Sequence, residues 1–319
     1  MTAGPDPVAS IVVPSYRGVD RLPALLDSLA AQQEGTPPFE VIVVVDGVDD
    51  GSVALLEAER RLTLRSILLP ENRGRVTALN TGFEAARGEV LIRCDDDLVV
   101  PPTYVVAHME AHPAGESVGV VGLTRDVHQP SPYARAYGED AAARSSAGAL
   151  ARPAGERWRL WAASCSISRS TWERIGRYDL RYRAYGWEDI DYGYRLHHAG
   201  IPILLAPGAT AEHHGPARTA AARARKAFES GAARATFLHL HPEAPLPAPS
   251  AGHGPWGAAV RVTARGLTSA RAAERAGTIA DRLLPRVPVP VGRKLVALAV
   301  EAAGLAGTRT GSRETGATS

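Results

Sequence analysis

Continuous apolar runs alternate with segments of helical periodicity over the first two thirds of this chain. The apolar runs lie at residues 8–13, 41–45, 66–69 and 90–94. Strands separated by helices of this length build a parallel sheet through right-handed crossovers. Helices then cover both faces of the sheet, which explains why these runs are continuously apolar rather than alternating. The sequence therefore predicts an α/β fold with a mixed, mainly parallel sheet flanked by helices.

Composition divides the chain further. We expect a catalytic domain at 1–241, a Pro-rich linker at 242–255, a basic helical C-terminal appendage at 256–308 and a disordered tail at 309–319. Within the first domain, 131–156 is polar with little periodicity, which predicts a mobile loop or a short irregular insertion. Residues 256–319 carry ten Lys or Arg against four acids. That excess fits either a helical appendage packed on the core or a surface that docks on a membrane or a partner.

Charge and cysteine content limit the partners and the compartment. A net charge of +2 excludes an obligate polyanion partner such as nucleic acid, and it leaves the oligomeric state open. Cys94 and Cys165 sit in apolar stretches, as expected of buried free thiols in a reducing compartment. The N-terminus lacks the pattern of a signal peptide, and no apolar run reaches the ~18 residues of a spanning helix. We therefore expect a cytoplasmic protein.

Acidic residues follow two of the predicted strands at their carboxyl ends, where ligands of open α/β sheets bind. Asp46 ends the run 41–45, and Asp95, Asp96 and Asp97 end the run 90–94. Neighbouring buried carboxylates repel one another unless a cation binds them. On an extended stretch Asp95 and Asp97 point the same way, so that one can meet a nucleotide and the other a metal. Hard oxygen ligands suit Mg²⁺ or Mn²⁺ bridging a diphosphate. The alternative is a solvated loop that caps the segment beginning at Pro101.

Two further polar motifs lie downstream. Glu188 and Asp189 open a segment of helical pattern, where acids either complement the helix dipole or accept a proton from a hydroxyl. The aromatic residues around them, Tyr182, Tyr185 and Trp187, would suit a ring-stacking floor for a sugar. Further on, His213 and His214 follow a strand, and one of them is either structural or an imidazole ligand to Mn²⁺ beside carboxylates.

These motifs occur in an order that resembles glycosyltransferase family 2 proteins of the GT-A fold, over roughly residues 9–215. The resemblance implies contacts with a nucleotide sugar for Pro14, Ser15, Tyr16, Asp46, Arg73, Asn80, Asp95, Asp96 and Trp187. It implies a metal held by Asp97 with Asp95 and His213. It also implies that Asp189 is the catalytic base and that Glu188 orients a substrate. One departure is that the usual Asp-Asp-Gly-Ser is split here by Val48 and Asp49.

The function implied by the resemblance is inverting transfer of a sugar from a nucleoside diphosphate, UDP first and GDP or dTDP as alternatives. The acceptor is the hydroxyl of a glycan, a lipid-linked intermediate or a small secondary metabolite. The basic C-terminal segment favours a site of action at the inner face of the membrane. A sugar nucleotidyltransferase is an alternative, but residues 14–18 do not form its glycine-rich phosphate loop. A non-catalytic scaffold on the same fold is the other alternative.

Overall fold

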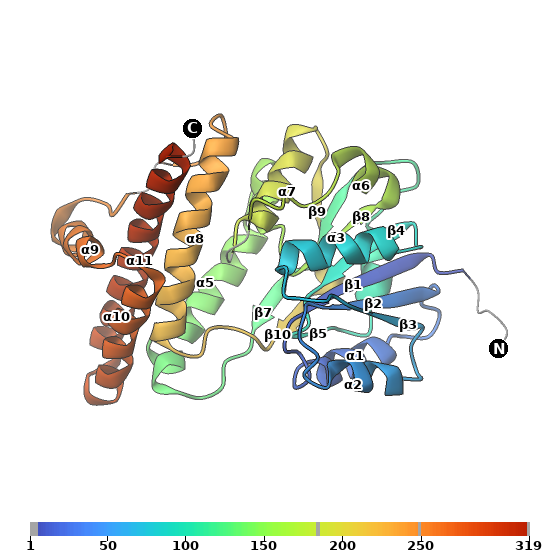
Figure 1. The fold of residues 1–319 in the computed structure, drawn as a ribbon, viewed down its shortest axis with the longest axis horizontal. Coiled ribbons are helices and arrows are strands. Elements are labelled where there is room, and N and C mark those ends of the chain that lie inside the picture. Colours follow the sequence, from blue (N-terminus) through green and yellow to red (C-terminus); the bar gives the residue numbers. More distant parts are fainter. Residues whose placement is uncertain (1–5, 183–185, 248–249, 318–319) are drawn as a thin grey trace. The chain divides into compact units, whose positions relative to one another are not determined.

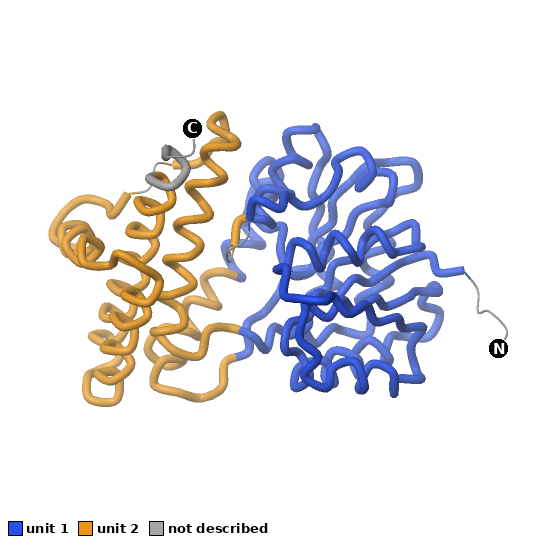
Figure 2. Tube along the Cα trace, viewed as in Figure 1, with its two compact units in different colours: residues 1–127, 146–183, 188–215 blue, residues 128–145, 184–187, 216–319 orange. Residues whose placement is uncertain are grey.

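The computed structural model describes residues 6–182, 186–247 and 250–317, and the chain forms two compact units (Figure 2). The first unit comprises residues 1–127, 146–183 and 188–215, and the second comprises 128–145, 184–187 and 216–319. Both cysteines, Cys94 and Cys165, are buried free thiols, as the sequence predicts.

The first unit is built on a sheet of seven strands within the described residues (Figure 1). Their order is β3 (Leu64–Leu68), β2 (Phe39–Val45), β1 (Ala9–Ser15), β4 (Val90–Cys94), β8 (Ser164–Ser168), β6 (Gly119–Val121) and β9 (Ile203–Leu205). Strands β1 to β4 pair in parallel, whereas β8 runs antiparallel to β4 and β6. The mixed, mainly parallel sheet flanked by helices is confirmed.

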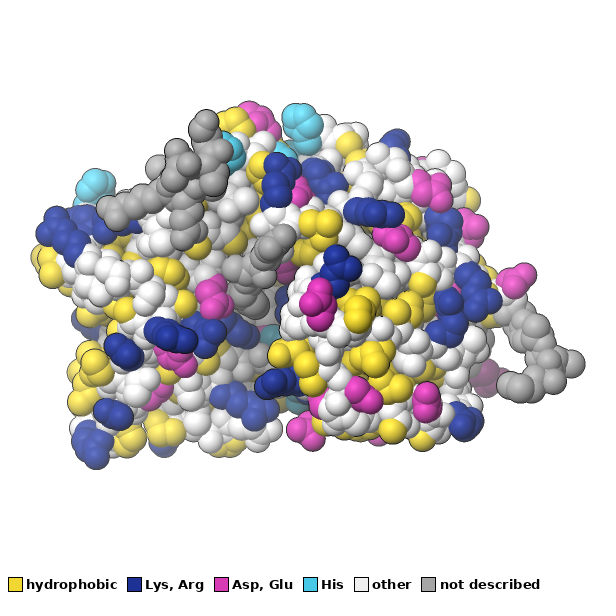
Figure 3. Space-filling view, viewed as in Figure 1, with side chains coloured by type: hydrophobic (Ala, Val, Ile, Leu, Met, Phe, Trp, Pro, Cys, Tyr) yellow, Lys and Arg dark blue, Asp and Glu magenta, His cyan; other side chains and the backbone are white. Residues whose placement is uncertain are grey.

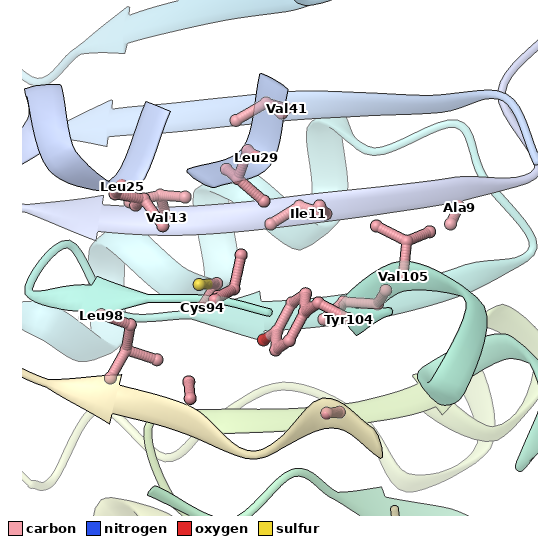
Figure 4. Packing of buried hydrophobic residues seen from close by; sticks show 14 of the residues in the cluster. Ala9, Ile11, Val13, Leu25, Leu29, Val41, Cys94, Leu98, Tyr104 and Val105 are labelled. Carbon is pink, nitrogen blue, oxygen red and sulfur yellow. The ribbon is translucent and has the colours of Figure 1, made fainter. Parts of the chain in front are cut away.

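The first strands are buried on both faces because helices cover each side. Ile11 and Val13 of β1 pack with Leu25 and Leu29 of α1 (Leu22–Ala30), as Figure 4 shows. Val12 points the other way, toward α3 (Arg75–Ala85). Full burial of each such side chain stabilises the fold by about 1.5–3 kcal/mol. The core therefore holds the carboxyl ends of β1, β2 and β4 at one edge of the sheet.

A smaller sheet of three strands brings a distant segment to that edge. Its strands are β5 (Leu98–Val99), β10 (Ala211–His213) and β7 (Thr124–Asp126). The register places His213 opposite both Leu98 and Asp126. The remaining elements of this unit are α2 (Ser52–Ala58), α4 (Tyr104–Glu110), η2 (Ala154–Leu160), α6 (Arg169–Ile175), α7 (Glu188–His198) and η3 (Pro207–Ala209).

The second unit is helical. It contains η1 (Ala134–Gly138), α8 (Ala220–Leu240), α9 (Gly254–Gly266), α10 (Ala270–Leu283), η4 (Leu284–Arg286) and α11 (Val289–Ala317). Its core is rich in alanine, so that the helices approach closely; Ala224 and Phe228 of α8 pack with Ala302 and Ala303 of α11. No helix of the described residues has the length and apolar character that crossing a membrane requires.

The segment 131–156 differs from our prediction of an irregular loop. Helix α5 (Glu139–Leu150) and the preceding η1 together fill most of it. None of the residues of α5 is buried, which explains why the sequence shows no apolar periodicity there. Its alanines favour a helix, but they do not form an apolar face that the sequence pattern could reveal.

The second unit also starts earlier than the helical appendage that we expected at 256–308. Helix α8 belongs to it because Ala224 and Phe228 are buried against the C-terminal helices rather than against the sheet. At the other end, α11 continues to Ala317, through most of the segment 309–319 that we expected to be disordered.

Candidate functional site

The three consecutive acids Asp95, Asp96 and Asp97 point to three different groups of partners. The backbone N–H of Leu98 donates to the carbonyl oxygen of Asp95 at 3.3 Å, which closes a turn directly after β4. Because the chain turns there, the two-residue alternation of an extended strand does not apply. Our prediction that Asp95 and Asp97 point the same way assumed an extended stretch, which the structure does not have there, so each acid has to be considered separately.

Asp97 is directed toward the smaller sheet. Its Oδ2 lies 3.3 Å from Nε2 of His213, while Nδ1 of His213 lies 2.6 Å from Oδ1 of Asp126. Burial opposes the charge of this histidine, but the hydrogen bonds to Asp126 and Asp97 raise the pKa of His213 to about 9. A metal-binding histidine usually donates the N–H of its other ring nitrogen to a carboxylate, which orients the ring. His214 instead contacts the exposed Glu212, so His213 is the histidine at the site.

The pair formed by Asp97 and His213 fits a divalent cation. Oδ1 of Asp97 is buried and accepts no hydrogen bond from the described residues. A Cβ on Gly215 would lie 1.8 Å from Oδ2, so only glycine leaves this carboxylate room. Within the part of the chain described, no three acidic, histidine or cysteine side chains form a closed metal cage. Two protein ligands with the rest supplied by substrate phosphates is the arrangement that Mg²⁺ commonly takes.

A cavity of about 400 Å³ lies beside this pair. It is lined by Pro14, Ser15, Tyr16, Arg21, Asp46, Asn72, Gly74, Arg75, Ala78, Asp96, Asp97 and Gly215. These residues come from the ends of three strands, from the start of α3 and from the segment after β10. A volume of this size suits a small ligand such as a nucleotide. The sequence-predicted residues Pro14, Ser15, Tyr16, Asp46, Asp96 and Asp97 are thus brought together.

Asp46 shapes one wall of the cavity by holding the backbone of the next loop. Its two carboxylate oxygens accept the N–H groups of Arg73 at 2.8 Å and Gly74 at 2.9 Å. The loop can approach so closely because residue 47 is glycine. Its φ is +81°, and a Cβ at this position would lie 1.9 Å from the backbone nitrogen of Asn72. The side chain of Arg73 is exposed, outside this cavity, and lines a neighbouring one with Thr77.

Arg21 is a site residue that sequence reasoning missed. It donates to both oxygens of Asp96, at 3.0 and 2.7 Å, and to the carbonyl oxygens of Tyr16 and Arg17. Ser15 donates to Asp96 as well, at 2.7 Å. Burial nevertheless raises the pKa of Asp96 above its ordinary value. Nothing in the sequence pattern marks Arg21, because its partner lies 75 residues away.

Arg93 is the second missed residue, and it is fully buried in strand β4. Its Nε lies 2.9 Å from Oδ1 of Asp95, and its Nη1 contacts Oδ1 of Asp189. Burial opposes the charge on Asp95, but the charges of Arg93 and Arg75 hold its pKa below the ordinary value. The available signal was a lone arginine inside the apolar run 90–94. Asp95, which the sequence assigned in part to the metal, is ion-paired with Arg93, and the charge of His213 also lowers its pKa.

Glu188 and Asp189 open helix α7 beside this arginine pair. Nη1 of Arg75 lies 3.5 Å from Oε1 of Glu188 and 3.9 Å from Oδ2 of Asp95. Burial, with the negative charge of Asp189, raises the pKa of Glu188 to about 7. The side chain of Asp189 is 16% exposed, and only its Oδ1 is held by Arg93. Arg75 also lines the cavity, so it connects the cavity with the two acids.

Two other predicted contacts have different surroundings from those expected. The side-chain amide of Asn80 pairs with the backbone N–H and carbonyl oxygen of Tyr178, both at 2.9 Å, because Asn80 lies on the buried face of α3. Trp187 belongs to the second unit, where its Nε1 donates to Ser230. Tyr182 is buried with its hydroxyl on Asp191, and Tyr185 lies outside the described residues.

Comparison with known sequences places this site in a family. The sequence model described as "Glycosyl transferase family 2" matches residues 10–171. The protein named "Uncharacterized glycosyltransferase YfnE" of Bacillus subtilis (strain 168) is 37% identical over 116 residues, 36% of this chain and 29% of that protein. The undecaprenyl-phosphate 4-deoxy-4-formamido-L-arabinose transferase of Serratia proteamaculans (strain 568) is 30% identical over 201 residues, 61% of this chain and 54% of that protein. The chain spans about half or less of the curated relatives it matches.

Solved structures share the fold at low identity. The mannosyltransferase PcManGT from Pyrobaculum calidifontis, in complex with GDP-Man and Mn²⁺, has a TM-score of 0.59 at 20% identity, over 95% of this chain and 88% of that one. S. aureus TarS 1-349 has a TM-score of 0.54 at 16% identity, over 98% of this chain and 92% of that one. The fold is that of GT-A glycosyltransferases.

The buried Arg93 generates a prediction about stability. Arg93→Met leaves Asp95 and Asp189 without their buried cation, and we expect it to lower the free energy of unfolding by about 3–5 kcal/mol. Adding Asp189→Asn should restore part of that loss, because it removes one of the stranded charges. Urea denaturation of the single and double variants measures both effects.

The matched control is Arg177→Met, which removes an exposed arginine paired with Glu84. It should change stability much less, because exposed ion pairs contribute little. An Arg93→Met variant as stable as Arg177→Met would contradict the importance that we give to Arg93.

Proposed function

The chain belongs to glycosyl transferase family 2, and from that premise we propose that it transfers a sugar from a nucleoside-diphosphate sugar to an acceptor hydroxyl. The observation that carries the proposal is that Asp97 and His213 meet beside a nucleotide-sized cavity. Arg75 lines this cavity and pairs with Glu188. We assign the reaction to the first unit. UDP is the first expectation for the nucleotide, followed by GDP and dTDP.

We assign Mn²⁺ or Mg²⁺ to Asp97 and His213. When bound, the cation would offset the negative charge that grows on the departing diphosphate. The protein's own contribution there is to hold the two ligands with Asp126 behind the imidazole. Asp46 fixes the backbone at Arg73 and Gly74 against the cavity. Arg75 adds a fixed positive charge at the cavity wall.

Asp189 is our candidate for the general base. Its Oδ2 accepts no hydrogen bond from the described residues, whereas Arg93 orients the carboxylate through Oδ1. The carboxylate takes the proton of the acceptor hydroxyl while that oxygen forms a bond to the anomeric carbon. The bond from the anomeric carbon to the diphosphate breaks, and the nucleoside diphosphate leaves with the electron pair. Attack from the opposite face inverts the configuration. Glu188, held by Arg75, orients a substrate.

The acceptor belongs to one of three classes, which are glycans, lipid-linked intermediates and small secondary metabolites. A membrane-borne acceptor is supported by an exposed stripe on α10 and η4, formed by Arg275, Ile279, Arg282, Leu283 and Arg286. Ile279 is 60% exposed and Leu283 39% exposed. Apolar side chains interleaved with cations suit the surface of an anionic membrane. We propose peripheral contact there, at the inner face of the membrane.

The first prediction concerns the metal. Incubation with UDP-, GDP- and dTDP-sugars in Mn²⁺, Mg²⁺ or EDTA should show release of one nucleotide that EDTA abolishes. Asp97→Asn keeps the shape of the side chain and should lower kcat/KM at least about 100-fold by removing a metal ligand. Asp27→Ala, which alters an exposed acid on α1, is the control.

Turnover by Asp97→Asn at the normal rate would show that the metal is not held there. Release of pyrophosphate from a sugar phosphate and a nucleoside triphosphate would identify a nucleotidyltransferase instead. A chain that binds no donor with any metal would be a scaffold.

The second prediction concerns the base. With the donor and an acceptor, Asp189→Asn should lower kcat by about 100-fold or more while the KM for the donor stays unchanged. Glu188→Gln should have a smaller effect on kcat, because the amide still orients a substrate. Near-normal turnover by Asp189→Asn would exclude it as the base.

The third prediction concerns the membrane. The protein should co-sediment with phosphatidylglycerol vesicles and not with phosphatidylcholine vesicles, and the Arg275→Ser/Ile279→Ser variant should lose this binding. The control is Arg144→Ser/Leu150→Ser, which removes one exposed cation and one exposed apolar side chain from α5. Equal loss in both variants would rule out a specific surface on α10.

A further inference from the structure

A second cavity of the first unit lies beside the one that we assign to the donor. Its volume is about 460 Å³, and its lining residues come from two segments of that unit, 71–77 and 180–182. Asn72 and Gly74 line both cavities. The two cavities therefore share the loop whose backbone Asp46 holds.

The polar part of the lining is available to a ligand. The side chains of Glu71, Asn72 and Arg73 are exposed, and they make no hydrogen bond or ion pair with the described residues. A carboxylate only accepts hydrogen bonds, a guanidinium only donates them, and an amide does both. The hydroxyl of Thr77 donates to the carbonyl oxygen of Arg73 at 3.1 Å, so its oxygen can still accept. This part of the cavity therefore offers both donors and acceptors.

The apolar part of the lining consists of Val76, Leu180 and Tyr182. Val76 and Tyr182 are each 4% exposed, whereas Leu180 is 60% exposed. The hydroxyl of Tyr182 donates to Oδ1 of Asp191 at 3.4 Å, so the aromatic ring is what this residue offers to the cavity. A single exposed leucine needs no explanation, but Leu180 extends an apolar surface that two other side chains begin.

The charges of the lining balance. Among the described lining residues one acid, Glu71, stands against one base, Arg73. The lining of the donor cavity, in contrast, holds three acids and two arginines. On the face of the first unit turned to the viewer, charged side chains of both signs lie among hydrophobic ones (Figure 3). An anionic ligand would meet Glu71 and a cationic ligand would meet Arg73, so the lining favours an uncharged ligand rich in hydrogen-bonding groups.

From these features we propose that this cavity binds an uncharged sugar unit of the acceptor, a role that rests on the proposed glycosyl transfer. Each hydroxyl of a sugar ring donates and accepts hydrogen bonds, and so matches both the accepting Glu71 and the donating Arg73. The C–H groups of the same ring form an apolar face, which packs against Leu180 and Tyr182. The volume of the cavity is in the range of sites for whole small ligands. Sugar binding itself does not depend on transfer.

Two connections within the first unit relate this cavity to the reaction. The first is the loop that it shares with the donor cavity. The second is Tyr182, which is bound to Asp191 of α7, the helix that carries the proposed base Asp189. The walls of the cavity are therefore a loop of the donor cavity and a residue anchored to the helix of the base, as an acceptor site requires.

The experiment is titration of the full chain, followed by saturation-transfer NMR, with the methyl glycosides of glucose, galactose and N-acetylglucosamine. The wild type should bind at least one of these uncharged sugars. The methyl glycosides of glucuronic acid and glucosamine carry a charge. They should bind at least about threefold more weakly, because a cavity without net charge does not compensate the hydration that an ion loses.

Variants locate the binding in this cavity. Leu180→Ser should weaken binding of the neutral glycoside about fivefold or more, because it removes apolar contact area. Thr77→Val keeps the shape of the side chain and should weaken binding about threefold, because it removes a hydrogen-bonding oxygen. The matched control is Leu150→Ser, since Leu150 is 61% exposed in the same unit and does not line the cavity. This control should leave the affinity unchanged.

The octyl form of the bound glycoside, used below its micelle concentration, identifies the source of the sugar. Tighter binding than that of the methyl form indicates a lipid-borne unit, and binding that is no tighter indicates a soluble glycan. The proposal is overturned if no neutral glycoside binds, or if a charged glycoside binds as tightly. It is also overturned if Leu150→Ser weakens binding as much as Leu180→Ser does.

Donor turnover, measured separately, distinguishes this proposal from the proposed glycosyl transfer. Turnover without glycoside binding would overturn this site alone. Glycoside binding without turnover would overturn glycosyl transfer and the acceptor role.

Discussion

A fully buried arginine organises the acidic side of the site. Arg93 lies inside an apolar strand, and a buried cation is tolerated only when carboxylates compensate its charge. Asp95 and Asp189 do so, from the turn after β4 and from the start of α7. This demand pairs Arg93 with Asp95 and with Oδ1 of Asp189. Asp97 pairs with His213 of the smaller sheet. The ion pairs of Arg93 therefore determine which partner each of these acids has.

The topology then decides which residues meet. Because β1, β2 and β4 are parallel neighbours, Ser15, Asp46 and the turn at 95–97 emerge at one edge. The short strand β10 pairs with β5 and β7, which carries His213 to the same edge. A binding site assembled from residues 14–215 therefore depends on backbone pairing as much as on side chains. Buried strands of this kind tolerate little movement, so the ligands are positioned before any substrate arrives.

The fold was predictable where the sequence encodes it locally. Strand 90–94 is an apolar run, interrupted by Arg93, that ends at the acids, and its bounds agree with the structure. The directions of Asp95 and Asp97 were not predictable, because a single backbone hydrogen bond replaces extended geometry by a turn. Asn80 shows the same limit. Its type suggests a ligand contact, but its position on the buried face of α3 directs its amide to the backbone of Tyr178. Partners this distant in sequence leave no local signal.

The net charge of the whole chain is small because its two parts carry net charges of opposite sign. Residues 1–215 carry 21 Lys or Arg and 28 Asp or Glu, whereas residues 216–319 carry 15 and six. In the helical unit the acids have structural partners, such as Asp281 at the first N–H groups of α8 and Glu229 with Arg225. With 15 against six, residues 216–319 therefore carry nine more cations than acids. Under the proposed assignments, the acidic first unit would bind its phosphate-containing donor through a metal held on Asp97 and His213. Chelation of the metal would then release the donor.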